Sequence, residues 1–309
     1  CSIVKAILRI PNITHATHLD QTPIHLACLM AATVDIVQIL IEADPASLLY
    51  RDAHGNTPLL CAISSSLRTQ RQTPTCDMLK LLLQTCPETA RKCDSRGVSL
   101  LELLFTTCLP PNISMSMEDS SIRSSLQLPE FQLFWNKVRL LLCALHRGNI
   151  ADLDTPNFKC LHAVVAANPN HAPMELIHFA SILHADEAMQ RDEHGHVPLA
   201  IAAASPFLTG GVHRRHVLEC LLRANAKAAS VADPNGRLPF LLAITNTNPT
   251  TWESGIQCLL DAAPHAISIR DRSTRMYPFM IAALQNQDEL VGLSNTFRLL
   301  REAPHLICM

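Results

Sequence analysis

Apolar residues along the chain fall into short runs with helical spacing. In residues 36–45, IVQILIEADP, a polar residue interrupts an aliphatic run, as expected of a helix with a wide buried face. The same pattern predicts helices over residues 78–87, 137–145, 217–225 and 255–264. Shorter apolar runs predict a second set of helices, whose first residues are Pro23, Pro58, Leu100, Cys160, Pro198, Pro239 and Pro278. The two sets alternate, so the chain is predicted to consist of helix pairs.

A recurring turn precedes the helices of the second set, as in residues 52–62, DAHGNTPLLCA. Asp52 can accept a hydrogen bond from the backbone two residues further on, and Gly55 supplies a positive φ. Thr57 is a candidate N-cap, and Pro58 occupies the first helical position, where a missing N–H costs nothing. Copies of this turn begin at Asp94, Asp192, Asp233 and, more loosely, Asp271.

A connector of fixed length links each long helix to the next turn. Seven positions separate Pro45 from Asp52, and the same spacing recurs from residue 87 to 94 and from 264 to 271. This constancy predicts a repeated geometry, in which the proline, or Ala185 and Ala226 at the equivalent positions, starts an extra helical turn.

Residues 22–27, TPIHLA, resemble the TPLHxA signature of ankyrin repeats. The resemblance is strong at 52–62, 192–202 and 233–243, and weaker at 94–104, 157–166 and 271–283. It implies an all-α, ankyrin-like helical repeat solenoid with short turn or β-hairpin fingers. A proline replaces the glycine that usually follows the second helix. In this family the histidine of the signature, here His25 and His162, bonds between neighbouring turns.

The predicted array covers residues 1–309 as a single domain of about seven two-helix units, behind a leading half unit at residues 3–10. Its helix starts lie 35 to 60 residues apart, against about 33 in standard ankyrin repeats. Most of the excess lies in polar loops within the pairs. The longest, residues 109–130, has few side chains that could be buried and is predicted to be disordered. HEAT-like pairing is the alternative fold, but it would lack the Asp-x-x-Gly turn.

Composition narrows the class of protein further. The formal net charge is −2, so no basic field favours nucleic acid, and no apolar run reaches the about 18 residues of a membrane span. The twelve cysteines include no CxxC pair, which favours a reducing, intracellular compartment, cytoplasm or nucleus. Because residue 1 is a cysteine, we expect the sequence to be cut from a longer protein.

Catalytic and cofactor motifs are absent from the sequence. It contains no HExxH, P-loop, GxGxxG or GxSxG motif, so neither an enzyme nor a cofactor is predicted. His213, His216 and Cys220 are spaced i, i+3 and i+7 and are candidate metal ligands on one helical face. The alternative, which we favour, places Cys220 in the core and the two histidines in solvent beside Arg214 and Arg215.

The resemblance implies that exposed finger residues form the binding surface. These are Arg51, His54, Asn56, Arg96, Arg191, His194, His196, Asn235, Arg237, Arg270, Arg272, Arg275 and Tyr277. Recurrent basic side chains predict a positive ridge that suits an acidic peptide or protein segment. Equally, each arginine could simply pair with the aspartate of its own turn.

The predicted function is that of a non-catalytic protein–protein interaction scaffold. The alternative is a regulatory or substrate-recruiting segment of a larger enzyme, such as a kinase or ubiquitin ligase, with its catalytic part outside this chain. A thiol- or metal-responsive module using His213, His216 and Cys220 is a third hypothesis.

Overall fold

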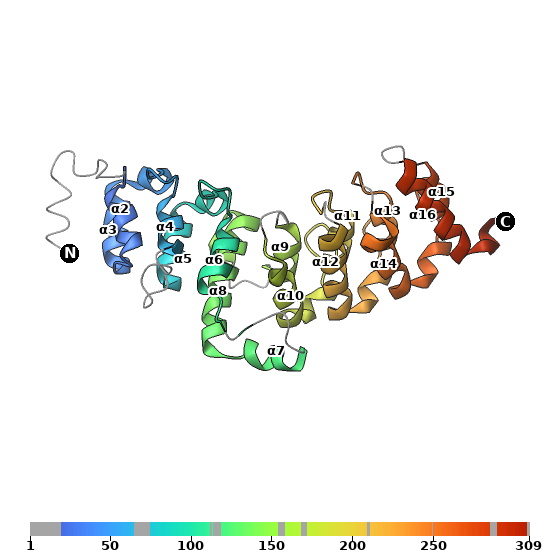
Figure 1. Ribbon diagram of the computed structural model, residues 1–309, viewed down its shortest axis with the longest axis horizontal. Coiled ribbons are helices and arrows are strands. Elements are labelled where there is room, and N and C mark those ends of the chain that lie inside the picture. Colours follow the sequence, from blue (N-terminus) through green and yellow to red (C-terminus); the bar gives the residue numbers. More distant parts are fainter. Residues whose placement is uncertain are drawn as a thin grey trace. The chain divides into compact units, whose positions relative to one another are not determined.

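The computed structural model describes residues 20–64, 75–111, 113, 119–153, 158–167, 172–208, 211–248, 250–284 and 289–307. Within these ranges all regular elements are helices, and no strand occurs (Figure 1). The all-α class is therefore confirmed. The predicted leading half unit at residues 3–10 lies outside the described residues.

The shorter helices begin where the turn pattern predicts. They are α2 (Pro23–Leu29), α4 (Pro58–Ser64), α6 (Leu100–Cys108), α9 (Cys160–Ala166), α11 (Pro198–Ala204), α13 (Pro239–Ile244) and α15 (Pro278–Ala283). Five of these begin with proline, whose fixed φ suits the first helical turn. In α6 the Ser99 hydroxyl instead accepts a hydrogen bond from the Glu102 N–H at 3.1 Å.

The second helices alternate with the first. They are α3 (Val34–Ala43), α5 (Cys76–Thr85), α8 (Pro129–Arg147), α10 (Met174–Leu183), α12 (Gly211–Ala224), α14 (Gln257–Ala262) and α16 (Glu289–Glu302). A π-helical turn, η8 (Trp252–Ile256), precedes α14.

The predicted extra turn follows six of the second helices as a short 3₁₀ helix. These are η1 (Pro45–Leu49), η3 (Pro87–Arg91), η6 (Ala185–Met189), η7 (Ala226–Ser230), η9 (Pro264–Ser268) and η10 (Pro304–Ile307). A shorter one, η4 (Ile150–Asp152), follows α8. The connector that repeats in the sequence is therefore also repeated as a structure.

The chain divides into two compact subdomains, residues 1–158 with 171–173 and residues 159–170 with 174–309. In the N-terminal subdomain α2, α4 and α6 pack side by side, and α3, α5 and α8 form a second layer behind them. Its core includes an aromatic cluster on α6 and α8, where the rings of Phe105 and Phe134 meet edge-on at 5.0 Å.

The C-terminal subdomain has the same two layers. Helices α9, α11, α13 and α15 form one layer, and α10, α12, α14 and α16 form the other, each paired with its sequence neighbour. The interior contains small side chains beside large ones, for example Ala202 of α11 with Phe240 of α13, both buried. Small side chains allow the helices to approach closely. The prediction of one continuous array over both subdomains stays a prediction.

Residues 109–130 differ from the predicted disordered loop. The structure places α7 (Asp119–Leu126) there, together with the first residues of α8. Ile122 and Leu126, four residues apart, are both buried, and α7 packs against α8. Two apolar side chains on one helical face thus suffice to anchor a short helix in a Ser-rich segment. Residues 112 and 114–118 lie outside the described residues.

Candidate functional site

The turn before α4 is closed by both side-chain and backbone hydrogen bonds. The Asp52 carboxylate accepts from the N–H groups of His54 at 3.0 Å and Asn56 at 2.8 Å. The Asp52 N–H donates to the Asn56 carbonyl at 2.9 Å, and the Gly55 N–H donates to the Asp52 carbonyl at 2.8 Å. Gly55 has a φ of 77°, as the sequence predicts. The finger is therefore a tight turn, because no strand of a β-hairpin occurs among the described residues.

Four further turns follow this design. The turns at Asp94, Asp192 and Asp233 have the same pair of backbone bonds, and their glycines have φ values of 78° to 82°. The fifth turn, at Asp271, is one residue longer, and Arg275 with a φ of 60° occupies the place of the glycine. The looser sequence match at 271–283 therefore reflects a longer turn of the same kind.

Neighbouring turns within a subdomain are bonded to one another. Arg51 Nη1 donates to the Gly55 carbonyl of its own turn at 2.7 Å and to the Cys93 carbonyl, before the next turn, at 3.1 Å. In the C-terminal subdomain Arg191 repeats this bridge, reaching the Ala232 carbonyl at 3.0 Å. Both arginines therefore act as bridges between turns.

The turns also touch directly. A Cβ atom added at Gly55 would lie 3.3 Å from the Cβ of Ser95, and one added at Gly195 would lie 2.8 Å from Pro234 Cγ. Each glycine thus faces the second residue of the following turn. Its lack of a side chain serves the close approach of turns as well as the positive φ.

The signature histidines bond to the following turn. Nε2 of His25 lies 3.1 Å from the carbonyl oxygens of both Tyr50 and Asn56. His162 makes the equivalent contact with the His196 carbonyl at 3.2 Å. Burial lowers the pKa of His25, which keeps the ring neutral and suited to donating from Nε2. The histidine bonds between neighbouring turns, as the resemblance implies.

The turn aspartates are ionised groups whose oxygen atoms point inward. Burial alone would raise the pKa of Asp52, but hydrogen bonds from Asn56, Gln21 and His54 outweigh it and hold the pKa below its usual range. The pKa of Asp271 is also lowered, first by the hydroxyl of Ser273. These carboxylates satisfy backbone donors and are not oriented for acid–base chemistry.

Two of the predicted ridge arginines pair with their own aspartates. Arg96 lies 3.0 Å from Asp94, and Arg237 lies 3.1 Å from Asp233. This is the alternative reading of the basic residues, and it holds for these two turns. Arg272 and Arg275 make no ion pair within the described part of the chain.

The predicted binding residues differ in exposure. Exposed are Arg51, His54, Arg96, Arg191, His194, Asn235, Arg270, Arg272 and Arg275; half-buried are Asn56, His196 and Arg237. Tyr277 is only 8% exposed, so its side chain does not belong to the exposed tips. It precedes α15 and lies under Arg270, whose guanidinium carbon is 4.5 Å from the ring centre.

Arg214 overturns the expectation that it lies in solvent, because it is 2% exposed. Its guanidinium donates to the carbonyls of Leu208 at 2.9 Å and Asn248 at 3.1 Å, and to the Thr250 hydroxyl. A further contact reaches the Ser205 carbonyl at 3.4 Å. One side chain therefore joins the loops of two successive helix pairs. Nothing in its sequence neighbourhood, between two histidines and another arginine, distinguishes it.

Buried amides reinforce these loops. Asn246 donates to the carbonyls of Ala203 at 3.2 Å and Ser205 at 2.9 Å, and Asn295 of α16 donates to the Thr250 carbonyl at 2.9 Å. Each amide comes from the helix pair that follows the loop it contacts. The Ser/Thr/Asn-rich loops are thus held by long-range polar contacts.

The proposed metal ligands do not form a three-ligand group. Cys220 is buried, as the core reading predicts, and lies 3.6 Å from His216 Nε2 and 3.9 Å from His178 Nδ1. His213 is half-buried, and burial followed by the nearby His216 lowers its pKa. Among the described residues no group of three or more potential ligands could hold a metal ion.

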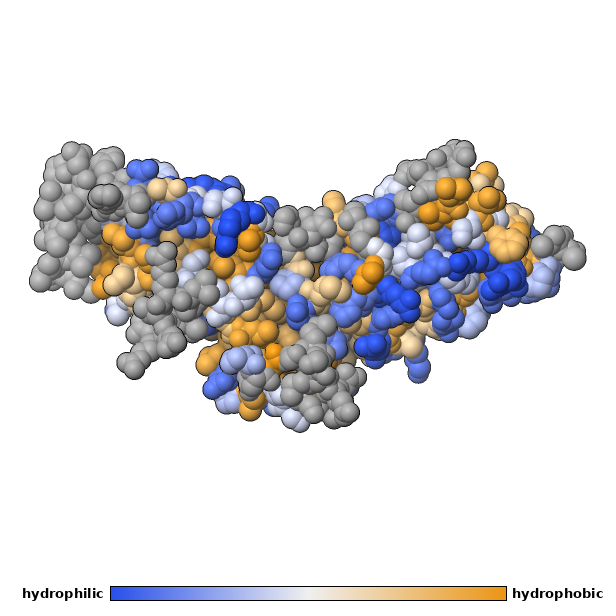
Figure 2. All heavy atoms as spheres, in the orientation of Figure 1, coloured by the Kyte–Doolittle hydropathy of each residue, from blue (hydrophilic) through white to orange (hydrophobic). Residues whose placement is uncertain are grey.

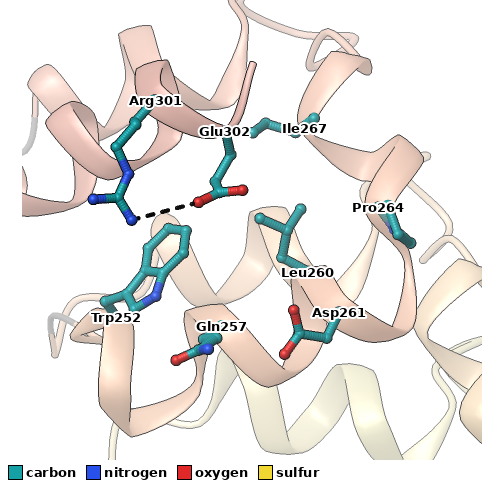
Figure 3. Close-up of a pocket in the computed structure, with 8 residues that line it drawn as sticks. All are labelled: Trp252, Gln257, Leu260, Asp261, Pro264, Ile267, Arg301 and Glu302. Carbon is teal, nitrogen blue, oxygen red and sulfur yellow. Dashed lines mark ion pairs between the residues drawn. The ribbon is translucent and has the colours of Figure 1, made fainter. Parts of the chain in front are cut away.

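A pocket of about 520 Å³ lies between α14 with η9 and the end of α16 (Figure 3). Trp252 and Leu260 form its apolar part, and Asp261, Arg301 and Glu302 its charged rim; Arg301 lies 3.9 Å from Glu302. The rim charges are exposed to solvent. The pocket is therefore an open recess and does not resemble a water-excluding catalytic cavity.

The site is thus a set of stacked turns on paired helices, which is the geometry of a binding surface. No protein-family model matches the chain, and no curated protein matches its sequence. Within the described residues no helix is both long and apolar enough to cross a membrane.

Proposed function

We propose that this protein is an ankyrin-like helical repeat solenoid that acts as a non-catalytic protein-interaction scaffold. The observation that carries this proposal is the bonding of consecutive turns to each other by equivalent residues, Arg51 in one subdomain and Arg191 in the other. Turns held in register present side chains at fixed spacing, and a preorganised surface loses little entropy on binding.

The charges of the turn tips favour an acidic partner. The aspartate oxygens face the turn interior, whereas the guanidinium groups of Arg96, Arg272 and Arg275 are exposed. An approaching chain therefore meets positive groups first, and a segment rich in Glu or Asp is complementary to them. The predicted alternative, a recruiting segment of a larger enzyme, would use the same tips.

A peptide-binding measurement tests the acidic partner. A fluorescein-labelled, Glu-rich peptide is expected to bind better than a Lys-rich peptide of the same length, and added salt should weaken the binding. Replacing Arg272→Glu and Arg275→Asn removes two charge contacts, for about a tenfold loss of affinity. Asn is chosen because it tolerates the positive φ of Arg275. The matched control, Arg223→Glu with Lys227→Asn, alters exposed charges away from the turns.

A photo-crosslinking experiment tests the scaffold role itself. A photoreactive residue at the exposed tip His194 is expected to crosslink a cellular protein, whereas the same residue at Gln257 on α14 should not. Equal crosslinking from both positions would place binding elsewhere and contradict the proposal.

A further inference from the structure

The last helix pair carries an apolar face that nothing in the described structure covers. Its side chains are Met280 and Leu284 of α15 and Leu290, Leu293 and Phe297 of α16, with exposed fractions of 39%, 61%, 79%, 69% and 67%. Figure 2 shows hydrophobic surface over these two helices. Contiguous apolar patches are uncommon on the surface of monomers and mark interaction sites.

The three α16 side chains form one stripe. Leu290, Leu293 and Phe297 are spaced i, i+3 and i+7, which is the spacing of a helix–helix seam. On the opposite side of the helix, buried Asn295 donates to the Thr250 carbonyl of the preceding loop. The stripe therefore faces away from the preceding helix pair.

The stripe departs from the pattern of the earlier pairs. Counting back from Pro304, and from Pro264 in the preceding pair, Phe297 corresponds to Gln257 and Leu293 to Glu253. Gln257 and Glu253 are exposed, so these positions stay in solvent where a further helix pair follows. A missing next repeat would explain the exposure of Met280, whose equivalent in α13 is buried, but not the apolar stripe.

We infer that a second copy of this chain packs on this face, with the two α16 helices antiparallel about a two-fold axis. An apolar stripe is complementary to itself, which is the requirement of a two-fold interface. Charge selects the antiparallel arrangement, because Arg298 and Arg301 lie near the end of α16. A parallel pair would bring these cations together, whereas the antiparallel pair keeps them at opposite ends and opposes the helix dipoles. This inference is independent of the proposed function of the turns.

Sedimentation equilibrium of the whole chain tests the inference. The average mass should rise from 34.0 kDa towards twice this value as the concentration increases. The variant Leu293→Glu with Phe297→Gln, which copies the residues of the preceding pair, should stay monomeric with an unchanged circular dichroism spectrum. Phe207→Gln, an exposed aromatic residue outside this face, is the control and should dimerise as the wild type does. A monomeric wild type, or a variant that still dimerises, overturns the inference.

A mixing experiment tests the two-fold arrangement. In a two-fold interface both copies contribute the same stripe, so tagged wild type should capture untagged wild type but not the Leu293→Glu, Phe297→Gln variant. In a head-to-tail arrangement the variant would still bind through its other surface. Capture of the variant therefore refutes the two-fold pairing.

Discussion

The turns and the inter-helix loops of the C-terminal subdomain are held in contrasting ways. Each turn closes on itself through an aspartate and a residue of positive φ, and the same bonds recur from Asp192 to Asp233. The loop at residues 205–208 has no such local closure and depends on Arg214 and Asn246, which lie on later elements. Local closure repeats along the chain, whereas each loop depends on particular side chains far away in the sequence.

The contrast predicts that the loop fails completely when its clamp is removed. Arg214→Met keeps the length of the side chain but removes donors to several buried acceptors, including the Leu208 carbonyl. We expect a loss of about 3 kcal/mol in the free energy of unfolding, the scale of hydrogen bonds to a charged group. Urea unfolding measures the loss, and hydrogen exchange should increase at residues 205–208 and 245–248.

Arg215→Met is the control for this prediction. Arg215 is the exposed neighbour of Arg214 and pairs only with Glu219, one helical turn away. The control should leave the urea midpoint almost unchanged. If both variants unfold at the same urea concentration, Arg214 is not the clamp that its contacts indicate.

Two glycines separate turn closure from turn stacking. Gly97 and Gly195 have φ values of 82° and 81°, but a Cβ at Gly97 meets no atom within 4 Å, whereas one at Gly195 would lie 2.8 Å from Pro234 Cγ. Gly97→Ala should cost about 1 kcal/mol from the left-handed conformation alone. Gly195→Ala adds overpacking against the next turn, for a total of about 2 kcal/mol. Equal urea midpoints for the two variants would mean that the turns do not stack tightly.

The same contrast explains what the sequence could predict. Helix starts at Pro58, Pro198 and Pro239 follow from a turn aspartate, a glycine and a proline that are adjacent in the chain, and the structure reproduces them. The signal is local, so sequence reading finds it. The 3₁₀ turn that begins at Pro45 follows from the same kind of local evidence.

Non-local contacts were beyond the sequence. The burial of Arg214 arises from carbonyls up to 36 residues away, so composition alone placed it in solvent. Tyr277 was placed among exposed tips because it follows a turn, but its ring is covered by Arg270. The apolar stripe on α16 carried a visible signal, since Leu293 and Phe297 replace polar residues at equivalent positions of the preceding pair.

Acidification should weaken the turns while leaving the loop clamp intact. His25 Nδ1 accepts a hydrogen bond from the Thr22 N–H at 3.3 Å, while Nε2 faces the carbonyls of the next turn, so the ring must be neutral. Its pKa is lowered in the folded state by burial. Above about pH 6.5 the ring is neutral in both states. As the pH falls below this value the unfolded chain takes up the proton first, so the free energy of unfolding decreases.

Urea unfolding of the wild type and His25→Gln across pH 8 to about pH 5 measures this effect. The difference between the two proteins isolates His25 from the other histidines, and the variant should show the smaller loss on acidification. Hydrogen exchange in the turn at 50–56 should rise at low pH, while exchange at 205–208 should not, because Arg214 stays protonated. Parallel pH curves for both proteins would remove His25 from the pH response.

The smallest effect is expected where a loop contact is only half satisfied. Asn295 donates to the Thr250 carbonyl, but its Oδ1 is buried and accepts no hydrogen bond from the described residues. The cost of that buried oxygen offsets much of the bond, so Asn295→Ala should cost about 0.5 kcal/mol. Asn246 donates twice and its Oδ1 accepts from the Asn248 N–H at 3.1 Å, so Asn246→Ala should cost about 2 kcal/mol. If urea unfolding ranks Asn295→Ala as the more damaging change, then the Thr250 carbonyl, and not the amide, dominates this contact, and the loops depend on acceptors rather than on clamps.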